Sequence, residues 1–437
     1  MRDEGESGAV RVVITTVGCK LNQADSDWIR FCLEQSGHEV VDGAPADARI
    51  INTCTVTSRA DHDSRRLARR ARRESPGALV VVVGCLAETD AEALAAMPEV
   101  DWVVAKEDVP RLGHALAEGR RPAPSEQPLP GRLSPRPTIP SRARPRLIVQ
   151  DGCDRRCAYC KVPLARGPQR SLPRQQAIEQ ARALAQRGAN EIVVVGCNLG
   201  AYGEDLRPRT TLADLLSALL DEPLPRLRLT SIEPDTLRSE LVRIVASAGE
   251  RICPHLHIPL QSGSPEVLRA MRRPTDLEPV TEVVAEARQA RGLVGIGLDL
   301  LVGYPTEGEE EFVQTVALVE RLRPSRLHVF SYSPRAGTAA HALGDPVPGL
   351  EKRRRVRELL TLGEPMTAAF LSAHVGERVE VVVDRVDADG HVEGVTGTYA
   401  RARVCGADGA RPGGLVGASV VEVEGSVLVG KSTRVGT

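Results

Sequence analysis

Short runs of apolar, often β-branched residues alternate with longer polar stretches through the first 120 residues of the chain. The runs at 9–20, 47–54, 78–85 and 100–105 are predicted strands, and the stretches at 23–36, 61–74 and 91–97 are predicted helices. Strands that alternate with helices indicate a parallel sheet, because each crossover helix covers a face of that sheet. Residues 9–120 are therefore predicted to form a small, doubly wound α/β domain.

A segment rich in Pro and Arg interrupts this alternation. Residues 121–146 contain eight prolines and six arginines. Proline fixes φ and lacks a backbone donor, so neither a helix nor a central strand persists at this density. We interpret residues 121–145 as an extended linker, and contact between its arginines and an anionic partner is the alternative.

A second, longer alternation begins at residue 146. Strands are predicted at 146–150, 191–196, 226–231, 255–260, 295–302 and 326–332, and helices at 174–187, 211–220, 237–248, 265–271, 278–291 and 309–321. Six strand–helix units in succession indicate a partial (β/α)6 barrel. With a further helix near 350–371, this domain is predicted to span residues 146–372.

After Gly376 the apolar positions follow a period of two, and Gly and Asp separate the segments. This pattern is typical of short, half-buried strands in an antiparallel barrel. Residues 375–437 are therefore predicted to form a small antiparallel β-barrel. The whole chain is accordingly expected to be of the α/β class, with an all-β module at its end.

The composition narrows the possible functions. Hydrophobic residues make up 42%, charged residues 26%, and the formal net charge is −1. Any nucleic-acid site must therefore be a local basic patch. The longest apolar runs fall far short of the ~20 residues of a membrane span. The polar first ten residues do not resemble a secretory signal, and we expect a cytoplasmic protein without membrane contact.

Three of the ten cysteines, Cys153, Cys157 and Cys160, form a C-x3-C-x2-C motif in a polar segment. Three thiolates at this spacing can hold a four-iron cluster and leave one iron without a protein ligand. That iron can chelate S-adenosylmethionine, and electron transfer then yields a 5′-deoxyadenosyl radical. A zinc site is the alternative, but zinc usually takes a fourth Cys or His at short spacing, and none follows nearby.

The motif resembles that of the radical S-adenosylmethionine superfamily, and the resemblance covers the whole chain. The segments VGCKLNQADSD, INTCTVTSRADHDSRRLARRARR, VVVGC, QDGCDRRCAYCKVPLARGPQRS, GCNLGAYG, SIEP, HIPLQSGS, DLLVGYP and FSYSPRAGTAA are similar to methylthiotransferase motifs, in the same order. This resemblance implies two 4Fe-4S clusters, S-adenosylmethionine, an electron donor such as a flavodoxin or ferredoxin, and a sulfur donor. The C-terminal barrel resembles a TRAM domain, an OB-like RNA-binding module.

Cys19, Cys54 and Cys85 each end a predicted parallel strand. Ligands of open α/β sheets bind outside the carboxyl ends of the strands, so these thiolates can converge on one centre. Small core cysteines are the alternative, since free cysteine is often buried. The resemblance implies an auxiliary cluster here that carries the sulfur to be inserted. We interpret the remaining cysteines as core or surface thiols: Cys32, Cys197, Cys253 and Cys405. Cys197 also lies at a predicted strand end that faces the expected cofactor site.

Polar residues are also expected at the strand ends of the predicted barrel, where β/α barrels place their chemistry: Asn198, Glu233, Gln261 and Asp299. The resemblance implies that Tyr159 lies beside the adenine of S-adenosylmethionine, and that Asn198 and Glu233 lie near its ribose or methionine. Arg170 is the candidate for its carboxylate, because the Arg fork matches a carboxylate. Ordinary surface or supporting roles are the alternative. Two positions depart from the family pattern, Leu172 instead of Arg and Thr306 instead of Gly.

A strongly cationic helix is predicted just after Cys54, and it contains Arg59, Arg65, Arg66, Arg69, Arg70, Arg72 and Arg73. This charge favours a phosphate-binding surface, with Arg65, Arg66, Arg69 and Arg70 as candidate tRNA contacts. A solvated charged face is the alternative. In the C-terminal barrel the candidate RNA contacts are Arg401 and Arg403.

Three branches of the family differ in substrate: threonylcarbamoyl-adenosine in tRNA, isopentenyl-adenosine in tRNA, and an aspartate of a ribosomal protein. The segments GCKLNQADSD, TSRADHDSRRLARRARR and FSYSPRAGTAA resemble the threonylcarbamoyl branch. The expected activity is therefore methylthiolation of C2 of that base, next to the anticodon. A non-catalytic iron–sulfur scaffold that binds RNA is the alternative of another class.

Overall fold

The computed structural model describes residues 9–43, 45–123, 143–237 and 239–433. The chain divides into two compact units. The N-terminal unit comprises Met1–Ile139, Asp151–Arg156 and Cys160–Arg170, and the C-terminal unit comprises Pro140–Gln150, Cys157–Tyr159 and Ser171–Thr437. Most of the predicted linker, residues 124–142, lies outside the described residues.

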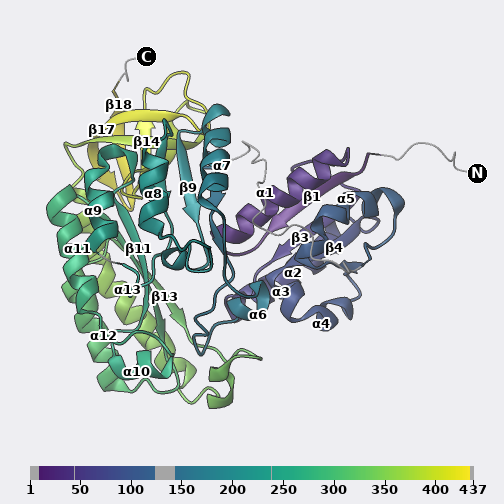
Figure 1. Cartoon of the computed structure of the whole chain (residues 1–437), viewed down its shortest axis with the longest axis horizontal. Helices are drawn as coiled ribbons and strands as arrows, with labels where there is room; N and C mark the ends of the chain where they lie inside the picture. The colour runs from purple at the N-terminus through teal and green to yellow at the C-terminus, as the bar shows by residue number, and fades with distance from the viewer. Residues whose placement is uncertain (1–8, 44, 124–142, 238, 434–437) are drawn as a thin grey trace, which may run out of the picture. The chain divides into compact units, whose positions relative to one another are not determined.

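A five-stranded parallel sheet forms the centre of the N-terminal unit (Figure 1). Its strands, in spatial order, are β2 (Glu39–Val40), β1 (Arg11–Thr16), β3 (Ala48–Thr53), β4 (Leu79–Gly84) and β5 (Trp102–Val103). The chain order reverses between β1 and β3, which makes this pair the switch point where doubly wound sheets bind ligands.

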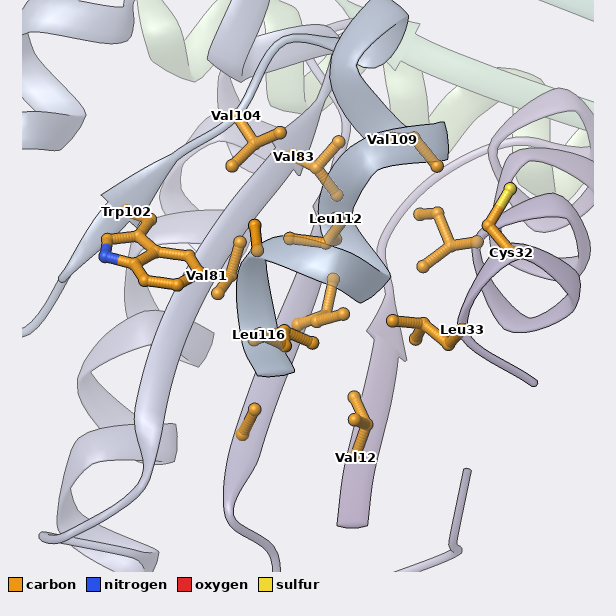
Figure 2. Close-up of a cluster of buried hydrophobic side chains, with 14 residues drawn as sticks. Val12, Cys32, Leu33, Val81, Val83, Trp102, Val104, Val109, Leu112 and Leu116 are labelled. Atoms are coloured by element: carbon orange, nitrogen blue, oxygen red, sulfur yellow. The ribbon is translucent and has the colours of Figure 1, made fainter. Parts of the chain in front are cut away.

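Helices cover both faces of this sheet, as the doubly wound prediction requires. Val12, Ile50 and Val81 pack on one face against α1 (Lys20–Gln35) and α5 (Val109–Glu118), and Figure 2 shows this core. On the other face, Ile51, Val80 and Val82 pack against α2 (Ser58–Glu74), α3 (Cys85–Thr89) and α4 (Ala91–Ala95). Successive strand residues point to opposite faces, so an all-apolar strand such as β4 is buried on both sides.

The C-terminal unit contains six parallel strands in chain order (Figure 1). They are β6 (Arg146–Ile148), β9 (Glu191–Val195), β10 (Arg226–Leu229), β11 (His255–Gln261), β12 (Gly295–Val302) and β13 (Arg326–Ser331). Two three-stranded sheets contain them, and the bridges Leu227–Ile252 and Ser231–His257 connect β10 to the chain around β11.

Helices connect these strands: α7 (Arg174–Gln186), α8 (Leu212–Leu220), α9 (Ser239–Ser247), α10 (Pro265–Ala270), α11 (Glu278–Arg291) and α12 (Glu309–Leu322). The sequence therefore located each of the six strands and six helices to within a few residues. Short elements complete the described chain: β7 (Gln150–Asp151), α6 (Val162–Arg166), β8 (Arg170–Ser171), and the 3-10 turns Lys106–Asp108, Leu199–Ala201, Gly249–Arg251 and Ala339–Leu343.

A closed five-stranded barrel ends the chain. The strands β14 (Arg378–Val386), β15 (Val392–Thr396), β16 (Arg401–Cys405), β17 (Leu415–Glu424) and β18 (Val427–Ser432) follow the long helix α13 (Gly349–Ser372). The prediction of an antiparallel barrel is wrong for one pair, because β16 and β18 are parallel. A closed ring with an odd number of strands cannot alternate in direction throughout, so at least one parallel pair is unavoidable.

A buried ion-pair network joins this barrel to the strands of the same unit. Arg228 is fully buried, contacts Glu191 at 2.6 Å, and donates to the Thr396 and Gly397 carbonyls at 2.8 and 3.0 Å. Burial alone would raise the pKa of Glu191, but Arg228 and Arg226 lower it to about 2. No helix among the described residues is both long and apolar enough to cross a membrane.

Candidate functional site

The structure brings Cys19, Cys54 and Cys85 together in the N-terminal unit. Cys19 precedes the first turn of α1, Cys54 follows β3 directly, and Cys85 begins α3 after β4. Since β1, β3 and β4 are adjacent and parallel, their carboxyl ends meet at one edge of the sheet, beside the switch point. Cys54 and Cys85 are buried, whereas Cys19 is exposed.

Asn22 holds the three strand ends in this arrangement. Its amide nitrogen donates to the Thr53 carbonyl at 2.6 Å and the Val17 carbonyl at 2.9 Å, and its Oδ1 lies 3.4 Å from the Cys85 Sγ. Gly18 has φ +106°, and a Cβ there would lie 2.6 Å from the Cys54 Sγ. Only glycine therefore fits the close approach between the chain after β1 and this thiol.

The electrostatics of the three thiols fit a metal centre. Burial raises the pKa of Cys54 to about 12, and the neighbouring Cys19 and Cys85 thiols raise it as well. A thiol with that pKa does not ionise alone at neutral pH, whereas a metal ion displaces its proton and takes the thiolate as a ligand. With Cys19 and Cys85, Cys54 forms a suitable donor set for an iron–sulfur cluster with one open iron.

Two buried cations flank this group. Lys106 Nζ lies 3.0 Å from the Cys85 Sγ and 3.6 Å from an Asp25 carboxylate oxygen. Arg166 donates to that Asp25 oxygen at 2.7 Å, to the Asn22 Oδ1 at 2.8 Å and to Asp151 at 3.0 Å. Sequence reasoning missed Asp25, Lys106 and Arg166 as site residues. Three signals were available. Asp25 lies in the CKLNQAD segment, Arg166 lies in the ARGP segment, and Lys106 follows the short strand β5.

The C-x3-C-x2-C loop lies between β7 and α6. Cys153 donates its N–H to the Gly167 carbonyl at 3.2 Å, and the Cys160 Sγ accepts from the Val162 N–H at 3.4 Å. Gly152 has φ +71°, and a Cβ there would lie 1.9 Å from the Pro168 carbonyl oxygen. All three motif cysteines are partly exposed, which leaves their sulfurs accessible to a cluster.

In the C-terminal unit, a buried arginine faces the middle cysteine of this motif. Arg273 Nη1 lies 3.6 Å from the Cys157 Sγ, and Nη2 donates to Glu233 at 2.5 Å and to the Pro259 carbonyl at 2.6 Å. Burial alone would lower the pKa of Arg273, but nearby Tyr159, Glu233 and Cys157 keep it above its usual value. Arg273 was also missed, because it follows a helix and no motif marks it.

Asn198 has the environment expected of a ligand-binding residue. Its N–H donates to the Gln150 Oε1 at 2.9 Å, and its side chain is buried. Its Oδ1 has no hydrogen-bond partner among the described residues. A buried acceptor without a donor costs about 1–3 kcal/mol, so a ligand hydroxyl or ammonium group at this oxygen is favoured. This observation fits S-adenosylmethionine, which carries both kinds of donor.

The structure locates the other predicted cofactor residues as follows. Tyr159 is partly buried against the cluster that contains Met271 and Tyr304, and the adjacent Ala158 donates to the Met271 carbonyl at 2.9 Å. Arg170 is exposed on β8. Of the two departures from the family pattern, Leu172 is a fully buried core residue and Thr306 is exposed.

The four remaining cysteines differ in their surroundings. Cys32 lies in the core against α5, and Cys253 is buried beside Glu191, where burial raises its pKa to about 12. Cys197 and Cys405 are partly exposed. Core placement agrees with the structural interpretation of Cys32 and Cys253, and the role of Cys197 stays open.

The arginines of α2 are already paired in part. Thr57 caps this helix by accepting from the Ala60 N–H at 3.1 Å. Acidic side chains contact six of the arginines: Arg65 with Asp90, Arg69 with Glu99, Arg70 with Glu74, Arg72 with Asp101, and both Arg59 and Arg66 with Asp63. Among these six, the side chains of Arg59 and Arg66 are the most exposed, at 91% and 72%. The cationic surface is therefore weaker than the sequence alone indicates.

In the C-terminal barrel, Arg401 is exposed and Arg403 pairs with Glu424 at 3.1 Å. Tyr399 packs on His255, with ring centroids 4.7 Å apart, and the Arg228 guanidinium lies 4.9 Å from its ring centroid. The one aromatic side chain of this barrel therefore belongs to its contact with the strands of the same unit, and it is not a base-stacking platform.

Comparisons with known proteins agree with this arrangement. The chain matches the Radical SAM superfamily over residues 147–319 and the Uncharacterized protein family UPF0004 over residues 11–105. The threonylcarbamoyladenosine tRNA methylthiotransferase MtaB of Bacillus subtilis is 35% identical over 85% of this chain and 84% of its own. The ribosomal protein uS12 methylthiotransferase RimO of Desulforudis audaxviator is 32% identical over 93% of this chain and 97% of its own.

The fold is also found among solved structures. The radical S-adenosylmethionine methyltransferase TsrM from Kitasatospora setae, determined with cobalamin and a [4Fe-4S] cluster bound, has a TM-score of 0.56. Its sequence is 17% identical, and the match covers 76% of this chain and 77% of that chain. At this identity the similarity establishes the fold alone.

Proposed function

Because the chain belongs to the radical S-adenosylmethionine methylthiotransferase family, we propose that it adds a methylthio group to C2 of N6-threonylcarbamoyladenosine in tRNA, next to the anticodon. The observation that carries this proposal is the pair of separate three-cysteine groups. One is the C-x3-C-x2-C loop, and the other lies at the carboxyl ends of β1, β3 and β4.

Each group would hold one 4Fe-4S cluster with an open iron. Cys153, Cys157 and Cys160 would ligate the first cluster, and Cys19, Cys54 and Cys85 the second. Together with S-adenosylmethionine, the first cluster supplies a carbon radical that can act on an unreactive aromatic C–H bond, and the second supplies the sulfur.

The residues around Cys157 would bind and orient S-adenosylmethionine. Asn198 offers a buried acceptor to the ribose or ammonium group, and Glu233, held by Arg273, offers a second one. Tyr159 would cover the adenine, and Arg170 would bind the carboxylate. The Arg273 side chain fixes Glu233 and donates toward the Cys157 sulfur, so it would maintain the distance between cofactor and cluster ligand.

The residues around Cys85 would balance the charge of the second cluster. A cluster ligated by three thiolates is anionic, and Lys106 and Arg166 place two cations at its edge. Asp25 contacts both cations, and Asn22 connects Arg166 to the strand ends. This network would help to hold Cys85 and the strand ends in position.

The choice of substrate rests on sequence segments and on one relative. GCKLNQADSD and FSYSPRAGTAA resemble the threonylcarbamoyl branch, and the Bacillus subtilis relative is named for that substrate. Isopentenyl-adenosine in tRNA and an aspartate of a ribosomal protein are the alternatives within the family.

The tRNA would contact two parts of the chain, the exposed arginines of α2 and the C-terminal barrel as a TRAM-like module. Residues 9–120, 146–372 and 375–437 would be the three domains, joined by the linker 121–145. A flavodoxin or ferredoxin type of protein would supply electrons, and a separate donor would renew the sulfur.

The test is mass spectrometry of tRNA nucleosides from a deletion strain, complemented with the wild-type chain or with Cys157→Ala. We expect 2-methylthio-threonylcarbamoyladenosine to disappear on deletion and to return only with the wild-type chain. Return of methylthio-isopentenyladenosine, or of a methylthio group on ribosomal aspartate, would assign one of the other branches.

The scaffold alternative has its own test. Reconstituted protein is incubated with dithionite and S-adenosylmethionine under anaerobic conditions. Formation of 5′-deoxyadenosine is expected, since the cysteine motif and the acceptor at Asn198 are both intact. No 5′-deoxyadenosine from fully loaded protein would favour the scaffold.

A further inference from the structure

Four polar side chains from four neighbouring strand segments form a continuous hydrogen-bonded row in the C-terminal unit. The Ser231 Oγ lies 2.9 Å from the His257 Nδ1, the His257 Nε2 lies 2.9 Å from the Asp299 Oδ1, and the His328 Nδ1 lies 3.2 Å from the same oxygen. We call Ser231, His257, Asp299 and His328 the polar row. Neither the cluster ligands nor the predicted S-adenosylmethionine contacts include any of the four.

Strand register brings the row together. Asp299 and His328 are direct partners between β12 and β13, and Ser231 and His257 form a bridge beside β10 and β11. Residues paired at the same level of adjacent strands point to the same face. Gly297 leaves space for the His257 ring, because a Cβ there would lie 3.0 Å from the His257 Cδ2.

The row lies on the strand face opposite the apolar core. On β12 the alternate residues Ile296, Leu298 and Leu300 are fully buried, whereas Asp299 between them keeps 19% of its side chain exposed. The side chains of His257 and His328 are 15% and 37% exposed. The row is therefore partly exposed to solvent and is not sealed inside the core.

The row is also close to the predicted reaction centre along the chain. Ser231 and Glu233 occur two residues apart in the SIEP segment, and Glu233 pairs with the Arg273 that faces Cys157. Ser231 therefore connects the row, through the SIEP segment, to the residues proposed to bind S-adenosylmethionine.

The hydrogen bonds define what the row offers to a ligand. Burial would raise the pKa of Asp299, but its hydrogen bonds from His257 and His328 hold the pKa well below its usual range. The group is therefore a carboxylate, and both imidazoles direct N–H groups at its Oδ1. The Asp299 Oδ2 and the second nitrogen of His328 are then acceptors. The row is thus acceptor-rich, and it suits a ligand that brings N–H or O–H donors.

Resting on the proposed function, we propose that the polar row is the recognition site for the N6 substituent of the substrate base, with Asp299 and His328 accepting from its ureido N–H and hydroxyl groups. The Asp299 Oδ2 can accept from one ureido N–H group, and the second nitrogen of His328 can accept from the hydroxyl group. A base without this substituent lacks these donors and would leave the carboxylate unsatisfied, which is an effective means of discrimination.

Two imidazoles and a carboxylate could instead bind a divalent cation, because their ligand atoms lie within 4.8 Å of one another. The observed contacts favour the substrate. Both imidazoles are already oriented by hydrogen bonds to one carboxylate oxygen, and Ser231 satisfies the second nitrogen of His257.

The experiment measures equilibrium binding of two anticodon stem-loops to the reconstituted protein, one with threonylcarbamoyladenosine and one with plain adenosine. Wild-type protein is expected to prefer the modified stem-loop. Asp299→Asn and His328→Phe are expected to lose about 10- to 100-fold in affinity for the modified stem-loop only, which corresponds to one charge-assisted hydrogen bond. His328→Gln should restore part of the loss, since its amide oxygen can still accept.

The matched control is His114→Gln. His114 is an exposed histidine on α5, and neither the proposed RNA contacts nor this proposal includes it. Reductive cleavage of S-adenosylmethionine in the absence of tRNA should be unchanged in every variant, which shows that the first cluster and its cofactor site are intact.

Three results would overturn the proposal: no preference by the wild-type protein, an equal loss for both stem-loops in the variants, or stoichiometric Mn²⁺ or Zn²⁺ binding that Asp299→Asn abolishes. Each of these results differs from what failure of the proposed function would give. If the proposed function were wrong, the nucleoside analysis would find no methylthio-threonylcarbamoyladenosine made by the wild-type chain.

Discussion

At the scale of single residues, Lys106 illustrates how the fold supplies chemistry that no motif contains. It follows the short strand β5, and its ammonium group reaches Cys85 and Asp25 across the carboxyl ends of the sheet. Its side chain is only 5% exposed. A buried lysine needs partners with negative charge, and Asp25 and a cluster ligated by Cys85 would both provide it.

Lys106→Met is predicted to lower the reduction potential of the auxiliary cluster. The cation stabilises the more negative, reduced state, and its removal makes reduction harder. The measurement is a redox titration followed by electron paramagnetic resonance, in protein with Cys153, Cys157 and Cys160 replaced by Ala so that one cluster remains. Lys106→Arg keeps the charge and should keep most of the potential. An unchanged potential in Lys106→Met would show that this ammonium group does not influence the cluster.

At the scale of elements, the sequence was most informative where local pattern decides the structure. The strand–helix alternation predicted β1, β3 and β4 and placed Cys19, Cys54 and Cys85 at one edge of the sheet. Short elements such as β2, α3 and α5 were not predicted, because two to ten residues carry too little periodic signal. The parallel β16–β18 pair follows from barrel closure, which no local pattern records.

The same distinction applies to the candidate site. The two cysteine groups could be proposed as ligand sets from spacing, from positions at strand ends and from the family resemblance. Of the polar row, only Asp299 was singled out from the sequence. Arg273, Arg166 and the contacts within the row were not predicted, because the partners are far away in sequence: Arg166 contacts Asp25 across 141 positions, and His257 contacts Asp299 across 42. Contacts of this kind depend on strand order and register, and a single sequence does not specify them.

The helix α2 provides a prediction at this scale. Arg59→Gln together with Arg66→Gln is expected to weaken tRNA binding and to flatten its salt dependence, because each phosphate contact contributes close to one unit of the salt slope. Among the arginines of this helix that form ion pairs, Arg59 and Arg66 have the most exposed side chains. The measurement is tRNA affinity as a function of salt concentration.

The control for this helix is Arg72→Gln. Arg72 pairs with Asp101 at 2.5 Å and donates to the Ala78 carbonyl at 2.9 Å, so it should affect stability more than RNA affinity. If the Arg59 and Arg66 variant binds tRNA with unchanged affinity and salt slope, α2 is a solvated charged face.

At the scale of the molecule, the C-terminal unit depends on a buried ion-pair network between its barrel and its six strands. Arg228→Met is predicted to destabilise this unit by about 3–5 kcal/mol, since it leaves Glu191 buried without its main partner. Arg182→Met, at the exposed pair with Glu222, is the control and should cost much less, because solvent screens an exposed ion pair. Thermal unfolding of both variants measures the difference, and equal melting temperatures would contradict a stabilising role for the network.

The network also predicts a response to acid. The pKa of Glu191 is lowered to about 2 in the folded chain, while an unfolded Glu titrates at about 4.3. Its contribution is therefore fully present above the unfolded pKa and is lost as the pH falls toward 2. In a series of melting temperatures from pH 6 to pH 3, the wild-type chain should lose stability in the acid range, and Glu191→Gln should lose less.

The two cysteine groups have separable roles in the whole molecule. Cys54→Ala removes a ligand of the auxiliary cluster only, so the variant should still cleave S-adenosylmethionine reductively and yet make no methylthio product. Cys157→Ala removes a ligand of the first cluster and should lose both activities. Iron analysis provides the independent readout: replacing Cys153, Cys157 and Cys160 together should lower the content from about eight to about four irons per chain. Methylthio product from Cys54→Ala at the wild-type yield would mean that Cys19, Cys54 and Cys85 are structural cysteines, and the sulfur would then have to come from a site elsewhere in the chain.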